Sequence, residues 1–459
     1  MSRLFGTDGV RGVANRELTC ELAMDIGRAA ATVLRAGRSR ANGRADAGDR
    51  PVQVLIGKDT RVSCDMLEAA LVAGLCSIGA DVQLLGVIPT PAVAYLVKAY
   101  GADAGIVISA SHNSFEHNGI KIFNRDGYKL SDELEDEIER VIRDKAYPAP
   151  PTGGDMGRVA TAEGAAGDYV AHLLKSVPAD LSDFKLLIDC ANGAASATAP
   201  MVFPALGAQC TFVHHLPDGL NINAGCGSTH IENLAEQMKT GKYDAALAFD
   251  GDADRLLMLD AHGNLVDGDQ ILIALGTYLK KKNELPGDTV VVTVMSNLGF
   301  FHACERQGLR VAKTKVGDRY VLEHMMENSF VLGGEQSGHI IALRHATTGD
   351  GELTALLLLA ACKEQGITVA KAAGLMERYP QVLIGVKATP DQKHRFETDP
   401  AIAAAIRDAE ARLGDAGRVL VRPSGTEPLI RVMAEGREQG AIQAVVDELA
   451  AFIQKALAL

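Results

Sequence analysis

The 459-residue sequence contains no tryptophan, and aromatic residues make up only 5% of it. A ligand-binding surface of stacked aromatic rings is therefore not favoured. No apolar run reaches the ~20 residues that a membrane-spanning helix needs, and the amino-terminal residues lack the apolar core of a secretory signal. The eight cysteines form no Cys-x-x-Cys pair. We therefore expect reduced core thiols in a cytoplasmic protein, and neither a metal framework nor a disulfide framework built on cysteine.

Positive charge is also scarce, since the formal net charge is −12. Nucleic-acid binders usually carry a basic surface, so we expect no nucleic-acid partner, and we expect no membrane partner either. The charge does not exclude a small phosphorylated ligand, which needs only a local cluster of Arg, Lys and backbone N–H groups. Hydrophobic residues at 47% and charged residues at 23% are typical of a globular chain.

The chain is too long for a single hydrophobic core, which indicates about three or four domains. Short β-branched runs alternate with longer amphipathic segments, and this pattern predicts parallel or mixed sheets covered by helices. Pairs of a strand and the helix after it are expected at 52–56 and 66–77, 185–189 and 194–206, and 289–294 and 298–307. We place four α/β units at residues 1–155, 156–260, 261–375 and 376–459. Residues 36–51 are expected to form a surface loop.

The first candidate motif is Ser109-Ala-Ser-His-Asn113, directly after a short apolar strand. Small polar residues in this place suit a phosphate loop, in which Ser111 could act as a nucleophile or phosphoryl carrier. His112 could move a proton or offset phosphate charge. Considered alone, the segment is explained better by a serine turn that caps a helix. Lys121 follows an Asn118-Gly119 turn signal and is expected in a short strand nearby.

The second motif is Asp250-Gly-Asp-Ala-Asp-Arg255, between two apolar strands. Carboxylates at every second position share one side of an extended segment. Such crowded anions repel one another unless a cation neutralises them, and oxygen ligands suit Mg²⁺. A calcium loop of the EF-hand type is excluded, because its Gly and Glu positions hold Arg255 and Ala261. A metal site is therefore favoured over an acidic turn.

Two further loops offer groups for a polar ligand. In Gly333-Gly-Glu-Gln-Ser-Gly-His339, Glu335 and Ser337 could bind sugar hydroxyls or an amine, although an ordinary Gly-rich loop explains this segment better on its own. In Arg422-Pro-Ser-Gly-Thr-Glu-Pro-Leu-Ile-Arg431, two arginines, a serine and a threonine bring many phosphate donors together. The P-loop pattern is absent, but a phosphate site is favoured over a polar hairpin turn.

Together, these motifs resemble those of the α-D-phosphohexomutase superfamily, in the same order along the chain. The opening segment Phe5-Gly-Thr-Asp-Gly-Val-Arg-Gly12 extends the resemblance to the amino terminus. Each motif is moderately specific by itself, whereas four in order are very specific. The resemblance implies an α/β fold of three related mixed α/β domains and a smaller α+β carboxy-terminal domain, arranged around a central cleft.

The resemblance also implies a role for each loop, with a phosphoserine at Ser111 that transfers its phosphoryl group in the presence of one Mg²⁺. The implied metal ligands are Ser111, Asp250, Asp252 and Asp254. The base that takes a proton from the substrate hydroxyl stays open among His112, Lys121 and Arg255. The implied substrate-binding residues are Arg11, Glu335, Ser337, Arg422, Ser424, Gly425, Thr426 and Arg431.

Within the superfamily, the serine loop, Gly334-Glu-Gln-Ser-Gly-His339 and Thr314-Lys-Val-Gly-Asp-Arg319 resemble the branch that acts on glucosamine phosphate. This implies an isomerase that interconverts glucosamine 6-phosphate and glucosamine 1-phosphate through glucosamine 1,6-bisphosphate, which could also activate it. Its partner would be this small phosphosugar, and its product would supply amino-sugar nucleotide and cell-wall precursor synthesis. A homodimer is expected on the same ground. The alternative is phosphomannomutase/phosphoglucomutase activity by the same mechanism.

Two other classes of protein are weaker alternatives. A catalytically silent phosphosugar sensor is disfavoured, because Ser111 and the three aspartates are all present. A phosphatase, in which water replaces the sugar hydroxyl, would show net release of phosphate. The chain departs from the superfamily at Ser114, where proline is usual. Because proline fixes φ, its loss could loosen the serine loop, but the reactive groups stay in place.

Overall fold

The computed structural model describes residues 3–6, 8–41, 50–424 and 428–458. The chain forms two compact units, one of residues 1–295 with 309–374 and the other of residues 296–308 with 375–459. The first unit contains three sheets with their helices, and the second unit contains one smaller antiparallel sheet. This organisation confirms the predicted α/β fold class.

The first sheet has six strands in the order β1-β5-β4-β2-β3-β6. The strands are β1 (Val10–Val13), β2 (Gln53–Lys58), β3 (Asp81–Val87), β4 (Ala104–Ile108), β5 (His117–Asn124) and β6 (Val159–Thr161). The helices are α1 (Cys20–Ala41), α2 (Cys64–Ser77), α3 (Thr90–Ala99) and α4 (Asp132–Asp144). Strand β4 is buried at every position, as expected for a central strand that is covered on both faces. Its carboxyl end leads directly into the serine loop.

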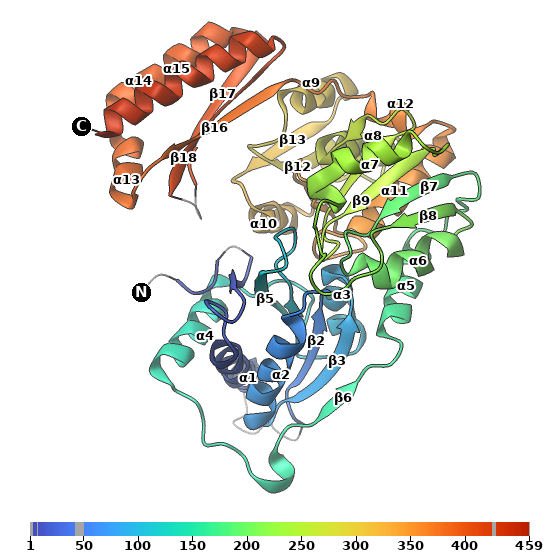
Figure 1. Cartoon of the computed structure of the whole chain (residues 1–459), viewed down its shortest axis with the longest axis vertical. Helices are drawn as coiled ribbons and strands as arrows, with labels where there is room; N and C mark the ends of the chain where they lie inside the picture. Colours follow the sequence, from blue (N-terminus) through green and yellow to red (C-terminus); the bar gives the residue numbers. More distant parts are fainter. Residues whose placement is uncertain (1–2, 7, 42–49, 425–427, 459) are drawn as a thin grey trace. The chain divides into compact units, whose positions relative to one another are not determined.

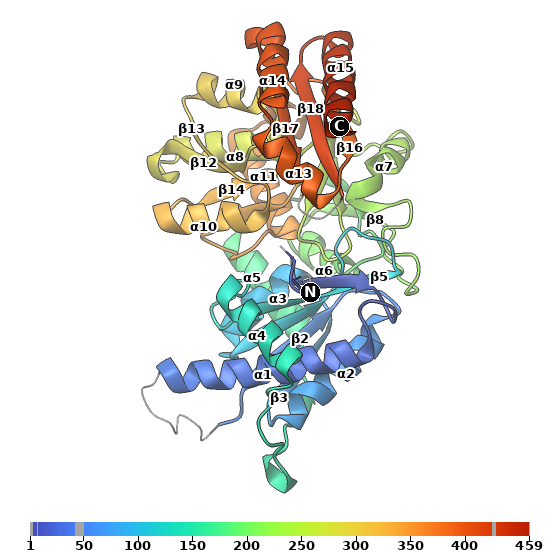
Figure 2. The same cartoon turned by 90° about the vertical axis from the view of Figure 1, so that its left-hand side faces the viewer.

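Helices α1 and α2 lie side by side in this part of the first unit (Figure 2). Two glycines let their backbones approach closely. A Cβ on Gly74 would lie 2.2 Å from the carbonyl oxygen of Met24, and one on Gly27 would lie 2.7 Å from that of Leu71. Larger residues at these two positions would therefore push the helices apart and disturb the core that they share with the sheet.

The second sheet has five strands in the order β11-β10-β9-β7-β8. Its strands are β7 (Lys185–Asp189), β8 (Gln209–Val213), β9 (Ala245–Phe249), β10 (Leu256–Asp260) and β11 (Leu265–Val266). Its helices are α5 (Ala165–Ser176), α6 (Ala195–Ala205), the short 3₁₀ helix η2 (Gly227–His230) and α7 (Ile231–Met238). Strands β9 and β10 pair antiparallel, and the turn between them carries the aspartate motif. All of β9 is buried, so this turn starts from the core of the sheet.

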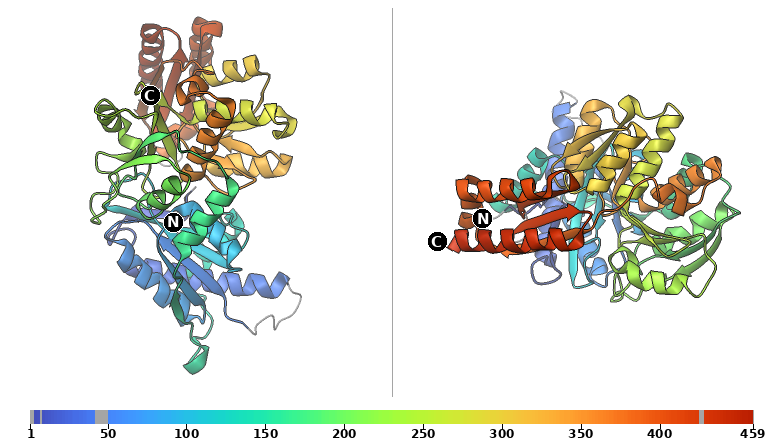
Figure 3. Two further views of the ribbon diagram at one scale, coloured as in Figure 1. Left: turned by 90° about the vertical axis from the view of Figure 1, so that its right-hand side faces the viewer. Right: turned by 90° about the horizontal axis from the view of Figure 1, so that it is seen from above.

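The third sheet has the order β13-β12-β14-β15. Its strands are β12 (Thr289–Thr293), β13 (Arg310–Thr314), β14 (Leu332–Gly334) and β15 (Ile340–Ala342). Its helices are α8 (Gly268–Lys281), α10 (Asp318–Asn328), α11 (Gly351–Gln365) and α12 (Val369–Ala373). Helix α11 is almost wholly buried and contacts β9 and β10 as well as β15 (Figure 3). It therefore joins the second and third sheets within the first unit.

The second unit is built on the antiparallel sheet β16-β18-β17. Its strands are β16 (Gln381–Lys387), β17 (Gly417–Pro423) and β18 (Leu429–Gly436). Its helices are α9 (Leu298–Gln307), α13 (Pro390–Thr398), α14 (Pro400–Leu413) and α15 (Gln439–Ala458). Helices α14 and α15 cover one face of the sheet (Figure 1). The core between them contains Ile402, Ile430, Val432, Val446 and Ile453.

The strand and helix pairs expected from the sequence are confirmed, with ends shifted by no more than two residues. The predicted turn at Asn118-Gly119 is wrong, because both residues lie inside β5. A Cβ on Gly119 would lie 2.5 Å from the carbonyl oxygen of Ser109, so this glycine permits close packing instead of a turn. The loop expected at 36–51 is partly wrong, since α1 continues to Ala41, and residues 42–49 lie outside the described residues. Within the described ranges, no helix is both long and apolar enough to cross a bilayer.

Candidate functional site

The serine loop holds Ser111 in a buried and strained position. Ser111 has a φ of 54°, a left-handed backbone conformation that residues other than glycine rarely adopt. Its N–H donates a hydrogen bond to Ser109 Oγ at 2.9 Å, and Ser109 Oγ donates to Asp59 Oδ2 at 2.6 Å. A conformation of this kind persists only where surrounding contacts impose it.

Arg61 and Asn223 supply those contacts. The Arg61 side chain is fully buried, and its Nε donates to Asp59 Oδ2 at 2.8 Å. Its Nη2 donates to the carbonyl oxygens of Ser111 and Asn113, both at 2.9 Å, while its Nη1 donates to two more carbonyl oxygens of the loop. Asn223 Nδ2 comes from the segment after β8 and donates to the same Ser111 and Asn113 oxygens at 2.9 Å. The serine loop is therefore clamped by side chains from two parts of the first unit.

The aspartate motif forms a tight turn, in place of the extended segment that the sequence predicted. The turn brings carboxylate oxygens of Asp250, Asp252 and Asp254 within 4.8 Å of one another. Ser111 Oγ donates a hydrogen bond to Asp250 Oδ2 at 2.6 Å. The approach requires glycine, because a Cβ on Gly251 would lie 2.5 Å from the carbonyl oxygen of Ser111. The structure therefore brings the first two motifs into direct contact.

The three carboxylates of this turn suit a hard divalent cation. All three aspartates are buried, and neither Asp252 Oδ1 nor Asp254 Oδ1 has a hydrogen-bond partner in the described part of the chain, although Asp254 Oδ1 forms ion pairs with His339 Nδ1 at 3.6 Å and Arg255 Nε at 3.8 Å. Burial, together with repulsion by Asp254 and Asp252, raises the pKa of Asp250 well above its usual range. Buried anionic oxygens are costly unless a cation neutralises them. Because a set of oxygen ligands is typical of Mg²⁺, the group could hold this ion.

Lys121, on β5, lies among these carboxylates. Its Nζ is 2.9 Å from Asp252 Oδ2, 3.0 Å from Asp8 Oδ2 and 3.7 Å from Asp254 Oδ2. Burial lowers the pKa of Lys121, but the three carboxylates outweigh this effect and hold the pKa above its usual value. Lys129 Nζ pairs with the other oxygen of Asp8 at 2.6 Å. Both lysines are therefore cations that offset the negative charge of the turn.

The other two candidate bases differ from each other in protonation. Burial, with Arg255 and Arg11 nearby, lowers the pKa of His112 to about 4. His112 Nδ1 lies 3.2 Å from Ser111 Oγ, so a neutral imidazole is next to the Ser111 hydroxyl. Burial lowers the pKa of Arg255, but Asp254 and the other carboxylates outweigh this and raise it above its usual value. Arg255, like Lys121, is therefore a cation.

The third motif follows β14 and packs against the start of β10. Gly338 has a φ of 92°, and a Cβ there would lie 2.2 Å from the carbonyl oxygen of Leu256. Glu335 Oε1 accepts a hydrogen bond from the N–H of Gly317 at 3.2 Å, and burial raises the pKa of Glu335. Ser337 is exposed. The loop thus combines a partly buried carboxyl group with an accessible hydroxyl group beside the second sheet.

The fourth motif lies in the second unit, in the hairpin of β17 and β18. Arg422 and Arg431 stand directly opposite each other in this antiparallel pair, so their side chains share one face of the sheet. Ser424 follows β17 and is buried. The other two predicted phosphate donors, Gly425 and Thr426, lie outside the described residues.

A buried carboxyl group, that of Glu352, lies in the first turn of α11, next to the aspartate turn. The N–H of Gly351 donates to the carbonyl oxygen of Ala253 at 3.0 Å and so joins α11 to the turn. Glu352 Oε1 accepts a hydrogen bond from Thr198 Oγ1 at 2.5 Å, while Oε2 is buried with no hydrogen-bond partner among the described atoms. Burial raises the pKa of Glu352 to about 8, so this carboxyl group is uncharged at neutral pH.

We therefore expect Glu352→Gln to stabilise the protein at alkaline pH. The unfolded chain loses this proton near pH 4.5, whereas the folded chain keeps it up to about pH 8. Stability is lost as the pH rises through this interval, and the neutral amide avoids the loss. Denaturant unfolding at about pH 5 and about pH 9 should show the advantage of the variant growing by about 4 kcal/mol. The exposed Glu163→Gln is the control, and the same pH dependence in wild type and Glu352→Gln would contradict a protonated Glu352.

The sequence analysis missed six side chains of this site: Asp8, Asp59, Arg61, Thr90, Lys129 and Asn223. Thr90 Oγ1 donates to Asp252 Oδ2 at 2.7 Å. Asp8 and Arg61 each lie in a short stretch of Gly, Thr and charged residues beside a strand, which could have signalled a polar loop. Thr90 and Asn223 carry no local signal, because they reach the site by contacts between distant segments. The predicted ligand residue Arg11 lies on β1 and forms an ion pair with Asp8.

The same fold occurs in known proteins. The sequence matches four domains of the phosphoglucomutase/phosphomannomutase family, with alpha/beta/alpha domains I, II and III at residues 2–148, 163–263 and 267–379 and the C-terminal domain at 383–452. A solved phosphoglucomutase/phosphomannomutase family protein of Burkholderia thailandensis matches with a TM-score of 0.82 at 23% identity, over 100% of this chain and 98% of that chain. Aspergillus fumigatus N-acetylphosphoglucosamine mutase, solved with GlcNAc-6P and magnesium, matches with a TM-score of 0.64 at 19% identity. The match covers 84% of this chain and 94% of that chain.

Closer relatives are found among curated sequences. The phosphoglucosamine mutase of Desulforamulus reducens is 53% identical over 455 residues, which is 99% of each chain. The phosphoglucosamine mutase of Caldicellulosiruptor saccharolyticus is 52% identical over 460 residues and covers 100% of each chain. The chain therefore belongs to the α-D-phosphohexomutase superfamily and, within it, to the phosphoglucosamine mutase family. This confirms both the superfamily and the branch that the motifs indicated.

Proposed function

We propose that this chain interconverts glucosamine 6-phosphate and glucosamine 1-phosphate, and that Ser111 carries the phosphoryl group. The observation that carries the proposal is the hydrogen bond of 2.6 Å from Ser111 Oγ to Asp250 Oδ2, beside two buried carboxylate oxygens with no hydrogen-bond partner in the described chain. A serine next to a cation site is the arrangement that phosphoryl transfer needs. Relatives with about half of their residues identical are phosphoglucosamine mutases, which favours this substrate over the neutral sugars of phosphomannomutase or phosphoglucomutase.

The reaction proceeds in two half-reactions. In the first, the free hydroxyl of the sugar phosphate gives its proton to the general base and attacks the phosphorus on Ser111. The bond from phosphorus to Ser111 Oγ breaks, Ser111 Oγ takes up a proton, and glucosamine 1,6-bisphosphate forms. After this intermediate has turned round, the Ser111 hydroxyl loses its proton and attacks the other phosphoryl group, and the sugar oxygen that is released takes up a proton. Each half-reaction breaks one ester bond and forms one, so no water enters the balance.

We assign the role of general base to His112. Lys121 and Arg255 are held as cations by neighbouring carboxylates and have no free electron pair for a proton. His112 is neutral and lies 3.2 Å from Ser111 Oγ. A phosphoryl group on Ser111 would place negative charge beside the imidazole and move its pKa upward, toward the range in which a base is effective.

The site suits one Mg²⁺, which the three aspartates and the phosphoryl group on Ser111 would hold. When bound, the ion supplies positive charge to the phosphoryl oxygens during transfer. Lys121 contributes to the same balance, because its ammonium group is 2.9 Å from Asp252 and 3.7 Å from Asp254. The aspartates and Lys121 thus hold the charges that phosphoryl transfer requires in fixed positions before the substrate binds.

The remaining loops bind the two ends of the substrate. Glu335 can accept hydrogen bonds from sugar hydroxyls or from the ammonium group of an amino sugar, and the exposed Ser337 offers a hydroxyl beside it. Arg11 adds a cation near the serine loop. The phosphate that is not transferred is assigned to Arg422, Ser424, Gly425, Thr426 and Arg431. Paired guanidinium groups suit phosphate because they donate in a planar fork.

The proposal extends to the setting of the enzyme. The segments 1–155, 156–260, 261–375 and 376–459 serve as serine, metal, sugar and phosphate domains. The eight cysteines are free thiols, which suits a reducing compartment such as the cytoplasm. We also propose a homodimer, activation by glucosamine 1,6-bisphosphate, and a product that enters amino-sugar nucleotide and cell-wall precursor synthesis.

The proposal is tested by comparing kcat/KM for the phosphates of glucosamine, glucose and mannose, with the full chain in Mg²⁺. We expect a preference of ~10-fold or more for the amino sugar, because the partly buried carboxyl group of Glu335 binds an ammonium group more strongly than a neutral hydroxyl. A preference for glucose phosphate or mannose phosphate would contradict the proposed substrate but not the proposed mechanism. Net release of phosphate without isomerisation would indicate a phosphatase.

Arg61→Lys should lower kcat by ~100-fold with a smaller change in KM. Lysine keeps the charge but cannot donate to four carbonyl oxygens in one plane, and a displacement of the reacting serine by about 1 Å can cost this much in rate. Steady-state kinetics give the measurement, with circular dichroism to show that the variant is folded. The exposed Arg140→Lys on α4 is the control and should keep the wild-type kcat. A folded Arg61→Lys enzyme with unchanged kcat would show that the clamp does not position Ser111.

A further inference from the structure

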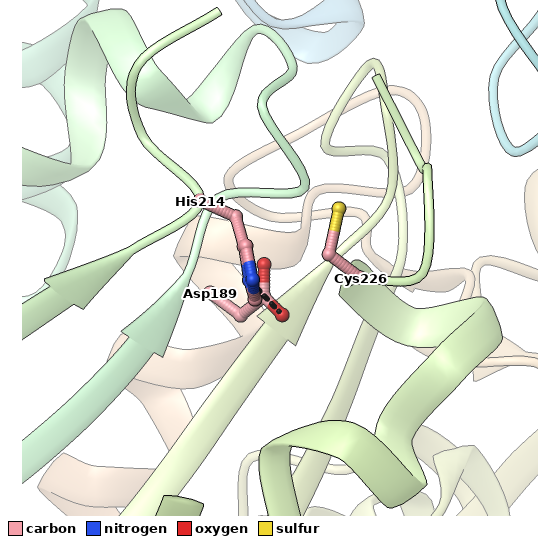
Figure 4. Close-up of side chains that lie close together, drawn as sticks. All are labelled: Asp189, His214 and Cys226. Atoms are coloured by element: carbon pink, nitrogen blue, oxygen red, sulfur yellow. Dashed lines mark ion pairs between the residues drawn. The ribbon is translucent and has the colours of Figure 1, made fainter. Parts of the chain in front are cut away.

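A second cluster of metal-ligating side chains lies in the second sheet, outside the proposed active site. Asp189 ends β7, His214 directly follows β8, and Cys226 directly precedes η2, so three separate segments bring them together (Figure 4). Their ligand atoms lie within 4.8 Å of one another, and Asp189 Oδ2 is 3.0 Å from His214 Nδ1. The proposed reaction uses none of these three residues.

The cluster is held in place before any ligand binds. Asp189 is buried, and its two carboxylate oxygens accept hydrogen bonds from the N–H groups of Ala191 at 2.8 Å and Gly227 at 2.9 Å. Oδ1 keeps a further electron pair for a ligand bond, whereas the second electron pair of Oδ2 faces His214 Nδ1 at 3.0 Å. Cys226 is fully buried, whereas the His214 side chain is 30% exposed and leaves a path from solvent.

The backbone around the cluster is strained in several places. Ala191, Asn192, His214 and Asn223 all have left-handed φ values, of 54°, 47°, 47° and 57°. Asn and His adopt such values more readily than other residues, whereas Ala191 keeps its conformation only because surrounding contacts impose it. Because the Ala191 N–H donates to the same Asp189 carboxylate that faces His214, this backbone conformation keeps the potential ligand atoms close together.

We propose that Asp189, His214 and Cys226 bind one thiophilic divalent ion of the zinc class, with its fourth position open to solvent on the side of His214. A thiolate, an imidazole and a carboxylate are the ligand types that zinc selects, whereas the all-oxygen turn at Asp250 suits Mg²⁺. Binding forms a bond from the metal to Cys226 Sγ and releases the thiol proton to solvent. The sequence analysis expected no metal site built on cysteine. The three ligands proposed here are scattered along the sequence and match no zinc spacing pattern.

The ion would strengthen the support of the serine loop. Asn223, in the segment between His214 and Cys226, donates to the carbonyl oxygens of Ser111 and Asn113. An ion that ties both ends of this segment to β7 would hold Asn223 in place. Its ligands do not touch the serine, so the ion would act through position and would leave the phosphoryl chemistry to the Asp250 turn.

The test uses the full chain, stripped with a chelator, held in excess Mg²⁺ to fill the oxygen site, and titrated with Co²⁺. Co²⁺ bound to a thiolate gives a near-ultraviolet charge-transfer band that an all-oxygen site cannot give. We expect this band to saturate at one Co²⁺ per chain and to be displaced by Zn²⁺. His214→Ala should weaken Co²⁺ binding by ~10-fold or more. Cys226→Ala should remove the band.

Matched controls separate the cluster from general effects. His215→Ala removes the neighbouring imidazole, and Cys362→Ala removes another buried thiol, so both should keep the band. Because His214 is partly exposed, His214→Ala should fold, and Zn²⁺ should raise its thermal midpoint less than that of wild type at the same Mg²⁺ concentration. Absence of the band in wild type, or its persistence in Cys226→Ala, would overturn the proposal without affecting the proposed mutase activity.

Discussion

Ser111→Ala is expected to lower kcat for the interconversion of the glucosamine phosphates by ~10⁴-fold or more. In the proposed mechanism, alanine removes the atom that accepts and returns the phosphoryl group, and loss of such a nucleophile is not compensated by the groups that remain. Ser111 Oγ is also the donor to Asp250 Oδ2, so the variant loses the contact between the first two motifs. The rate is measured with both isomers as substrate. Intact mass after incubation with glucosamine 1,6-bisphosphate should show one added phosphoryl group in wild type and none in the variant.

Ser114→Ala is the matched control for this experiment. Ser114 lies in the same loop, and Arg61 contacts only its carbonyl oxygen, which alanine retains. Its kcat should stay within about threefold of wild type, as for most surface substitutions. Full activity of Ser111→Ala would remove the serine from the mechanism. A large loss in both variants would mean that loop geometry, and not transfer through Ser111, limits the rate.

Those parts of the fold with a local cause could be predicted from the sequence. Helix α9 occupies the predicted range 298–307, because both of its ends are encoded nearby. Asn297 caps its first turn by accepting a hydrogen bond from the N–H of Gly299 at 3.0 Å, and Gly308 ends it with a φ of 65°. Strand β7 likewise has its predicted bounds, since a short apolar run between polar segments is typical of a buried strand.

Parts of the fold that depend on distant segments could not be predicted. The Asn118-Gly119 pair reads as a turn locally, but β1 and β4 pair with both sides of this segment and draw it into the sheet. The aspartate motif reads as an extended segment, but the contact with Ser111 needs a turn at Gly251. In both cases tertiary packing overrides the local structural preference. A single sequence does not show which distant segments contact each other.

The candidate site shows the same division. Each motif could be located, because small and polar residues after an apolar strand indicate a loop at the edge of a sheet. The clamp of Arg61 and Asn223 could not be located, since each residue lies far from Ser111 along the chain. The protonation of the candidate bases was also hidden. It depends on which carboxylates surround Lys121 and Arg255, and that is known only once the strands are packed.

Asp252→Asn should weaken Mg²⁺ binding by ~10-fold or more and lower kcat by ~10³-fold. The substitution keeps the size of the side chain and removes its charge. Asp252 Oδ2 receives hydrogen bonds from Lys121 Nζ at 2.9 Å and Thr90 Oγ1 at 2.7 Å, which leaves Oδ1 for a metal ion. An amide has fewer electron pairs for this purpose and turns N–H groups toward cations, so both the ion and the ammonium of Lys121 lose a partner. Loss of one preorganised electrostatic partner costs about 10²–10³ in rate.

The measurements are isothermal titration with Mg²⁺ and the dependence of kcat on Mg²⁺ concentration. Asp260→Asn is the matched control: Asp260 is buried at the far end of β10, where it accepts hydrogen bonds from the N–H groups of His262 and Asn264 at the next turn. Asparagine keeps these two bonds and loses only the bond that Asp260 Oδ2 accepts from Asn264 Nδ2 within the same turn, so this variant should keep the wild-type Mg²⁺ dependence. If high Mg²⁺ restores part of the kcat of Asp252→Asn, the loss lies in metal binding. An Asp252→Asn enzyme with wild-type kcat at every Mg²⁺ concentration would exclude the aspartate turn as the metal site.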